Sequence, residues 1–182
     1  MSHDETYISV DIETAGPNPS QYAMLSIGAC EVFEPANKFY VELQPDKEDF
    51  VPEALFVSGL KMDKLKERGE PPKAAMQKFA DWVADVTPPG HKPVFVAFNA
   101  PFDWTFVNDY FHRYLGHNPF GHSALDMKAF YMGLKGISWD ETSMKAIMQY
   151  YFGERSLTHH ALRDALDQAE LFQKMLEEAK EK

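Results

Sequence analysis

The chain has 182 residues, of which 18 are Lys or Arg and 28 are Asp or Glu, and its formal net charge at pH 7 is −10. Hydrophobic residues make up 45% and charged residues 25%, which excludes a disordered chain and predicts one globular domain over residues 1–182. The acidic balance argues against a protein that holds long nucleic acid through a broad basic face. No apolar run approaches the roughly 20 residues that span a bilayer, so we expect no membrane partner.

The single cysteine and the N-terminal residues indicate in which cellular compartment the protein works. Cys30 is the only cysteine, so no intrachain disulfide can form, and its apolar surroundings predict a buried structural thiol. The first residues are polar and acidic and lack the apolar segment of a secretion signal. These features predict a cytoplasmic protein.

The first half of the chain begins with three strand-like runs, over residues 7–12, 24–33 and 38–43. Because the connections between them are short, we expect an antiparallel meander. Two helices should follow: a short one from Pro52 that Gly59 closes, and a longer one over residues 72–86 with apolar residues at helical spacing.

In the second half, residues 93–98 are almost entirely apolar, which is typical of a strand buried on both faces in the middle of a sheet. A helix over 102–115 and a short strand over 123–126 should follow. The remaining predicted elements are helices over 128–134, 143–152 and 161–180. Strands followed by alternating helices and strands predict a mixed α/β sheet with helices on its faces.

Two carboxylates lie at the end of the first predicted strand. Asp11 and Glu13 straddle Ile12, and side chains two apart on a strand point to the same face. The pattern alone is weak, because Asp46 and Glu48 repeat it in a charged segment after a proline, where a loop is the better interpretation. Their place at the end of a buried strand is what favours Asp11 and Glu13 as a functional pair.

Two further carboxylates and a histidine complete the candidate site. Asp103 follows the central predicted strand, where ligand sites gather in α/β sheets, and Asp164 lies in the first turn of the last predicted helix. Four such carboxylates together would repel one another strongly, which indicates hard divalent cations. His159 precedes that helix, for which Thr158 is the predicted N-cap, and an imidazole there could take a proton from an attacking water.

In this order the motifs VDIETAG, FNAPFDW and HHALRDA resemble those of the DEDDh 3′–5′ exonucleases, which include RNase T, oligoribonuclease and the proofreading epsilon subunit of DNA polymerase III. The resemblance covers about residues 7–176 and implies an RNase H-like fold, with an antiparallel meander plus parallel strands. It implies two Mg²⁺ or Mn²⁺ ions and a two-metal mechanism that releases 5′-mononucleotides. The metal ligands that it implies are Asp11, Glu13, Asp103 and Asp164.

The resemblance also selects His159 as the general base over its neighbour His160, because the family places this histidine five residues before the last aspartate. It implies single-stranded 3′ ends or short oligonucleotides as partners, and a homodimer is an open alternative because some relatives dimerise. The substrate contacts that it implies are Thr14, Ala15, Gly59, Leu60 and Phe102.

Several alternatives stay open at the level of the sequence. The same chemistry would serve a proofreading or repair subunit that acts with a polymerase, and a non-catalytic nucleic-acid-binding module is a different class of protein. The sequence does not distinguish RNA from DNA, although the acidic charge favours short RNA ends or small oligonucleotides. Asp126 is predicted to support the site, and the three histidines His112, His117 and His122 to be solvated rather than to bind zinc.

Overall fold

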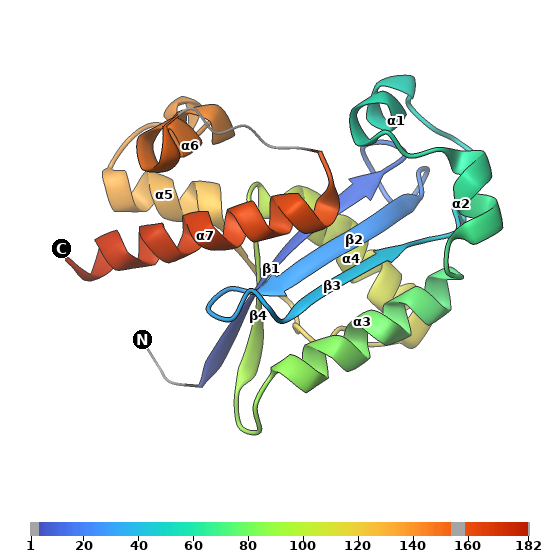
Figure 1. The fold of residues 1–182 in the computed structure, drawn as a ribbon, viewed down its shortest axis with the longest axis horizontal. Helices are drawn as coiled ribbons and strands as arrows, with labels where there is room; N and C mark the ends of the chain where they lie inside the picture. Colours follow the sequence, from blue (N-terminus) through green and yellow to red (C-terminus); the bar gives the residue numbers. More distant parts are fainter. Residues whose placement is uncertain (1–3, 154–158, 182) are drawn as a thin grey trace.

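Figure 1 shows the computed structural model of the chain, which describes residues 4–153 and 159–181. Over these residues five strands form one sheet in the order β3-β2-β1-β4-β5. The first three strands pair antiparallel, as the short connections predict, whereas β4 and β5 run parallel to β1. The strands are β1 (Glu5–Thr14), β2 (Met24–Glu31), β3 (Lys38–Glu42), β4 (Lys92–Ala97) and β5 (Ala124–Asp126).

Helices cover both faces of this sheet (Figure 1). One hydrophobic cluster joins the sheet to α3 and α4, and a second joins its opposite face to α5, α6 and α7. The helices α1 and α2 lie beside the ends of β1 and β3 instead. The helices are α1 (Pro52–Ser58), α2 (Met62–Arg68), α3 (Pro72–Val86), α4 (Ala100–Leu115), α5 (Met127–Lys135), α6 (Met144–Phe152) and α7 (Ala161–Lys180).

The two-residue period of β1 decides which side chains meet which layer. Ile8, Val10 and Ile12 belong to the cluster with α3 and α4. The alternate residues face the other way: the Ser9 hydroxyl donates to the carbonyl oxygen of Ala165 on α7 at 2.8 Å. Because the alternation continues along the strand, Asp11 and Glu13 share the face that α7 covers.

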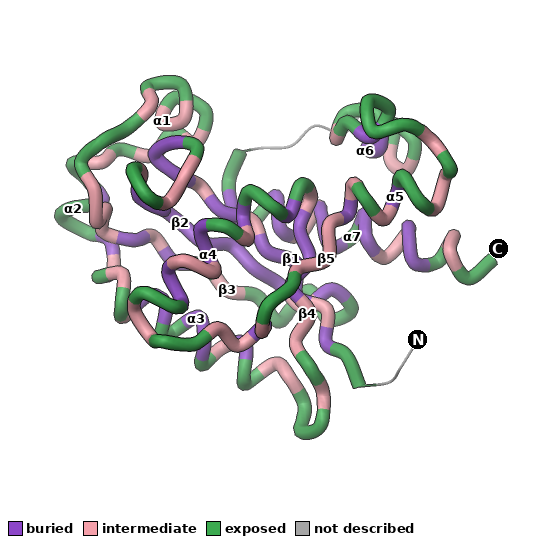
Figure 2. Tube along the Cα trace, turned by 180° about the vertical axis from the view of Figure 1, so that it is seen from behind, coloured by how far each residue is buried: buried purple, intermediate pink, exposed green. Residues whose placement is uncertain are grey.

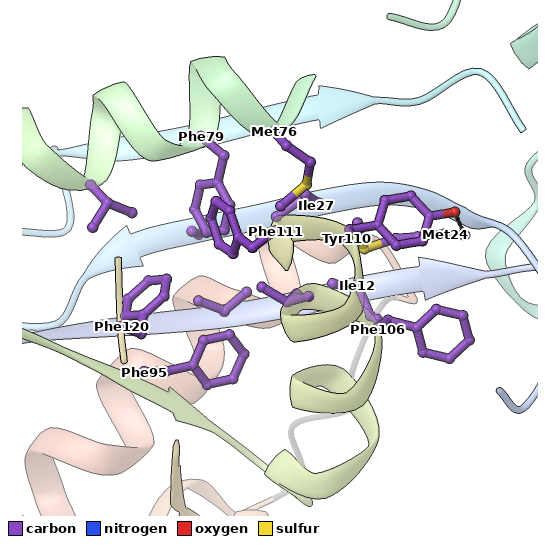
Figure 3. Close-up of a cluster of buried hydrophobic side chains, with 14 of the residues drawn as sticks. Ile12, Met24, Ile27, Met76, Phe79, Phe95, Phe106, Tyr110, Phe111 and Phe120 are labelled. Atoms are coloured by element: carbon purple, nitrogen blue, oxygen red, sulfur yellow. Dashed lines mark hydrogen bonds between the residues drawn. The ribbon is translucent and has the colours of Figure 1, made fainter. Parts of the chain in front are cut away.

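The strands β1 and β2 are mostly buried (Figure 2). Large aromatic side chains fill the layer between the sheet and the α3–α4 pair (Figure 3). Phe79 of α3 stacks on Phe111 of α4 with ring centroids 5.6 Å apart, and Phe95 of β4 meets Trp104 edge to face at 5.3 Å. Phe106, Tyr110 and Phe111 of α4 are fully buried, so these aromatic side chains belong to the hydrophobic core. This packing holds the N-terminus of α4 against the end of β1.

Gly28 allows α7 to approach the sheet closely. It lies opposite Asp11 in the β1–β2 pairing, and a Cβ atom built there would lie 2.2 Å from the backbone of Ala161 and Leu162. Only a residue without a side chain leaves room for the first turn of α7 at this point. The contact therefore fixes the height of α7 above β1.

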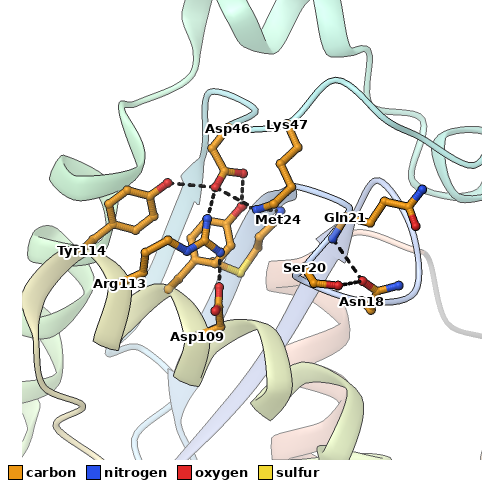
Figure 4. A network of polar contacts seen from close by, with 10 residues as sticks. Asn18, Ser20, Gln21, Met24, Asp46, Lys47, Asp109, Arg113 and Tyr114 are labelled. Atoms are coloured by element: carbon orange, nitrogen blue, oxygen red, sulfur yellow. Dashed lines mark hydrogen bonds and ion pairs between the residues drawn. The ribbon is translucent and has the colours of Figure 1, made fainter.

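The loop after β3 is fixed to α4 by a network around Asp46 (Figure 4). Its carboxylate accepts hydrogen bonds from the hydroxyls of Tyr110 at 2.6 Å and Tyr114 at 2.9 Å, and pairs with Arg113 and Lys47. Burial alone would raise the pKa of Asp46, but the hydrogen bonds from the two tyrosines and Lys47 hold it below its ordinary value. The prediction that Asp46 lies in a loop is confirmed, and its role is to anchor that loop.

The predicted elements agree closely with the structure. The bounds of α3 and α7 match the predicted helices, and the predicted mixed α/β sheet is confirmed. The helix α2 was not predicted, because its charged sequence buries only Leu65 and carries no apolar stripe. Thr158, the predicted N-cap of the last helix, lies outside the described residues. Within the described part of the chain, no helix is both long and apolar enough to cross a membrane.

Candidate active site

Three of the predicted carboxylates meet between β1 and α7. Asp11, Glu13 and Asp164 each offer an oxygen, and these oxygens lie within 4.8 Å of one another. Asp164 is only 4% exposed and lies in the first turn of α7, which the close approach at Gly28 holds over β1. All the donors are carboxylate oxygens, so this set fits a hard cation such as Mg²⁺ or Mn²⁺.

Asp103 stands beside this group, on the first turn of α4. Its Oδ1 accepts a hydrogen bond at 3.2 Å from the backbone N–H of Ile12, between the two acidic residues of β1. The β1–β4 pairing ends at Ser9 and Val96, so the backbone of β1 beyond that point needs other partners. The Asp103 carboxylate therefore fixes the end of β1 and is itself fixed, at 5% exposure, next to the other acids.

Burial and mutual repulsion both raise the pKa values of these carboxylates, and burial is the larger cause. Burial first, and then the charges of Asp103, Glu13 and Asp164, raise the pKa of Asp11 well above its ordinary value. Burial and the charge of Asp164 raise the pKa of Glu13 to about 7. Burial also raises the pKa of Asp103, against the hydrogen bonds from backbone N–H groups. A divalent cation would relieve this repulsion and keep all the carboxylates ionised.

A buried amide that the sequence did not reveal touches the first of these acids. Gln168 lies four residues after Asp164, on the same face of α7, and its Nε2 donates to Asp11 Oδ1 at 2.7 Å. The sequence does place Gln168 among the apolar residues of that helix, and a polar residue in an apolar stripe needs a polar partner. This position could have indicated a buried contact.

The two neighbouring histidines have different surroundings. His159 is exposed, precedes α7 by two residues and has a left-handed backbone with φ of 53°, which is uncommon for a residue other than glycine. The ring of His160 stacks on Tyr40 of β3 with centroids 4.9 Å apart. Tyr40 in turn donates to the Glu42 carboxylate at 3.0 Å. His160 is thus held against β3, although it too is exposed, and His159 lies two residues before α7. The role of His159 as general base stays a prediction.

The predicted substrate contacts differ in how much surface they present. Phe102 is 37% exposed on the first turn of α4, next to Asp103, and Gly59 is exposed at the end of α1. Leu60 is partly buried against the small apolar cluster beside β1. Thr14 donates its hydroxyl to the carbonyl oxygen of Gly16 at 2.9 Å, and Ala15 is fully buried. Any contact from Ala15 would therefore need a local rearrangement.

Asp126 supports the site from β5. Its carboxylate caps α5 by accepting from the backbone N–H groups of Lys128 and Ala129, and it also accepts from the N–H of Ala100 at 3.2 Å. It thereby links the starts of α4 and α5, which confirms the predicted supporting position. Among the described residues, no group of potential metal ligands includes His112, His117 or His122.

Comparisons with known proteins identify the family. The sequence model of the RNase T exonuclease family matches residues 8–172. The 3′-5′ DNA exonuclease Cap18 of Escherichia coli is 49% identical over 168 residues, which are 92% of this chain and 90% of that protein.

Solved structures have the same fold. The nuclease domain of 3′hExo, a DEDDh family member bound to rAMP, superposes with a TM-score of 0.80 at 15% identity, over 97% of this chain and 94% of that domain. Exonuclease I of E. coli, in complex with a dT13 oligonucleotide, gives a TM-score of 0.70 at 20% identity over 94% of this chain. This chain spans 40% of the length of exonuclease I.

The predicted RNase H-like arrangement, an antiparallel meander extended by parallel strands, is therefore confirmed. A family match over most of the chain and a relative at this identity agree with the three motifs of the sequence. The chain belongs to the RNase T exonuclease family.

Proposed function

We propose that this 3′–5′ exonuclease removes 5′-mononucleotides from the 3′ ends of single-stranded DNA. Asp11, Glu13, Asp103 and Asp164 would hold two divalent cations, Mg²⁺ or Mn²⁺. The observation that carries the proposal is the meeting of three carboxylate oxygens within 4.8 Å at the end of β1, in a chain of this family. Asp103 supplies the fourth carboxylate from α4.

The protein's own residues hold the cations, keep the site in a fixed geometry and accept a proton. When bound, two divalent cations stabilise the charge that develops on the attacking and leaving oxygens. The carboxylates are held by strand and helix backbones, so their positions require little reorganisation during the reaction. His159, in front of α7, accepts a proton from the attacking water as general base.

The choice of DNA rests on the relatives. Cap18, at 49% identity, is named as a DNA exonuclease, and exonuclease I was solved with single-stranded oligonucleotides. In the proposed substrate complex the exposed Phe102, adjacent to Asp103, stacks on a base near the 3′ end. Gly59 and Leu60 at the end of α1 and Thr14 at the end of β1 line the same nucleotide, and the buried Ala15 would reach it only after a local rearrangement.

The test uses purified protein with DNA and RNA 20-mers of matched sequence, labelled at the 5′ end, with Mg²⁺, Mn²⁺ or EDTA. We expect a ladder of DNA products shortened from the 3′ end, only when a cation is present, and slower degradation of the RNA. Asp103→Asn should abolish the ladder, because it removes one of the proposed metal ligands. A ladder shortened from the 5′ end, or an unchanged rate in Asp103→Asn, would contradict the proposal.

Three further predictions concern the protein's setting. Copurification with a polymerase would indicate a proofreading or repair role, and light scattering of the purified protein distinguishes a monomer from the homodimer that the sequence left open. The buried Cys30 is consistent with the reducing cytoplasm as the proposed location. Family membership decides against a non-catalytic binding module.

A further inference from the structure

The amide of Gln168 joins three elements of the site at one point. Gln168 lies on α7, one turn after Asp164, and only 3% of it is exposed. Its Nε2 donates to Asp11 Oδ1 of β1 at 2.7 Å, and its Oε1 accepts from the backbone N–H of Phe98, just after β4, at 2.8 Å. The side chain therefore has a partner at each end.

These two partners fix the orientation of the amide. A backbone N–H can only donate, so the oxygen of Gln168 must face Phe98, and its NH₂ group must then face Asp11. The Asp11 carboxylate is therefore held in one orientation by a side chain that is itself fixed at its other end. Because the amide engages one oxygen of Asp11, the second oxygen keeps both of its lone pairs for a metal ion.

We propose that Gln168 is a positioning residue for the nuclease reaction, which holds the Asp11 carboxylate by one oxygen and presents the other to a divalent cation. The inference rests on the metal site proposed above. Gln168 acts through Asp11 and touches neither cation nor nucleic acid. Partners of metal-binding side chains of this kind change metal affinity or activity by roughly 10- to 100-fold when removed.

The test compares Gln168→Leu with a matched control on the same helix. Gln173 also lies on α7 and donates its amide to a backbone carbonyl, that of Val32, away from the carboxylates. Gln173→Leu therefore removes a similar contact between α7 and the sheet. Calorimetric titration with Mn²⁺ should show affinity weakened about 10- to 100-fold in Gln168→Leu and unchanged in Gln173→Leu.

Kinetics separate positioning from general damage. We expect kcat of Gln168→Leu to fall about 10- to 100-fold while KM for a DNA oligonucleotide stays within about twofold, because the buried Gln168 does not touch the substrate. Melting temperatures without cation report the structural cost of both variants. If Gln168→Leu does not fold, Gln168→Met, which keeps the length of the side chain, replaces it.

A double-mutant cycle tests whether Gln168 acts through Asp11. In an Asp11→Ala background, Gln168→Leu should cause no further loss of Mn²⁺ affinity. A loss that persists in that background, an unchanged Mn²⁺ affinity in Gln168→Leu, or an equal loss in Gln173→Leu would overturn the inference. If the wild-type protein binds Mn²⁺ but degrades no oligonucleotide, the proposed function fails, while the calorimetric comparison still decides the role of Gln168.

Discussion

At the scale of single residues, the half-buried and buried carboxylates of the site make the stability of the cation-free protein depend on pH. The pKa of Glu13 is raised to about 7, and the pKa values of Asp11 and Asp103 are raised as well. A carboxyl group whose pKa is higher in the folded state stabilises the fold below its unfolded pKa, near 4, and loses that contribution as pH rises through the folded pKa. Ionisation of the site without a cation therefore weakens the fold.

We predict that, in EDTA, the melting temperature falls between pH 5 and pH 8, and that Mn²⁺ raises it more at pH 8 than at pH 5. A penalty of about 1–3 kcal/mol corresponds to a shift of about 2–10 °C for a chain of this size. Differential scanning calorimetry measures this shift.

Asp11→Asn is the control for this pH effect, because it removes one of the repelling charges without removing side-chain volume. Its melting temperature in EDTA should exceed that of the wild type at pH 8 and differ less at pH 5. A wild-type melting temperature that rises across this range, with no difference between the two proteins, would argue against a strained anionic cluster.

The adjacent histidines offer a second test at this scale. His159→Ala should lower kcat by roughly 10²–10⁴, the usual contribution of a general base, and leave the Mn²⁺-induced rise in melting temperature intact. His160→Ala should retain most of the activity, because the ring of His160 stacks on Tyr40 at the sheet. Single-turnover assays with labelled DNA measure both variants. The reverse result, an inactive His160→Ala and an active His159→Ala, would assign the base to the other histidine.

At the scale of elements, the site depends on how closely α7 approaches the sheet. Gly28 permits this approach, since any Cβ atom there would collide with the backbone of Ala161 and Leu162. We predict that Gly28→Ala lowers stability by about 1–3 kcal/mol or more and reduces both Mn²⁺ affinity and kcat, because Asp164 and Gln168 move with the helix. Chemical denaturation and Mn²⁺ titration measure the two effects.

Gly133→Ala is the matched control for Gly28. Gly133 lies inside α5, and a Cβ atom there would have no neighbour within 4 Å. This substitution should leave activity unchanged and stabilise the helix by about 0.5–1 kcal/mol. Equal losses of activity in the two variants would show that the close approach at Gly28 is not what aligns the site.

Local sequence patterns predicted the elements well because most of them have a clear period or a clear boundary. The apolar stripes of α3 and α7, the strand β4, and the place of Asp11 and Glu13 near the end of β1 were all predicted. Only the second half of β4 is fully buried. The helix α2 was missed because it exposes most of its surface.

Contacts between elements distant in the sequence could not be predicted in this way. The Asp46 network joins a loop to α4 across 64 residues, and Gln168 reaches Asp11 across 157 residues. The close approach of α7 to Gly28 likewise joins a strand to a helix far along the chain. Such contacts depend on the packing of layers, which a local pattern does not contain. Roles at the site came instead from the resemblance of three motifs to a family.

At the scale of the whole molecule, the net charge of −10 limits how the protein can hold a polyanion. A broad basic face would release many counterions from a long strand and make binding depend steeply on salt. In this protein, binding should instead depend on the few nucleotides at the cation site, because the remaining acidic surface repels the rest of the strand.

We therefore predict that kcat/KM on single-stranded DNA changes little once the strand exceeds a few nucleotides. The salt dependence of KM should correspond to one or two phosphate contacts. Each contact on a single strand contributes about 0.7 to the slope of log KM against log salt concentration, so we expect a slope of about 1 in magnitude. Initial rates on oligothymidylates of 4, 8 and 20 nucleotides, assayed between about 50 and 200 mM salt, measure both quantities. A steep salt dependence of KM together with a strong preference for the 20-mer would contradict this prediction. It would show instead that positively charged side chains form an extended binding surface that leads away from the site.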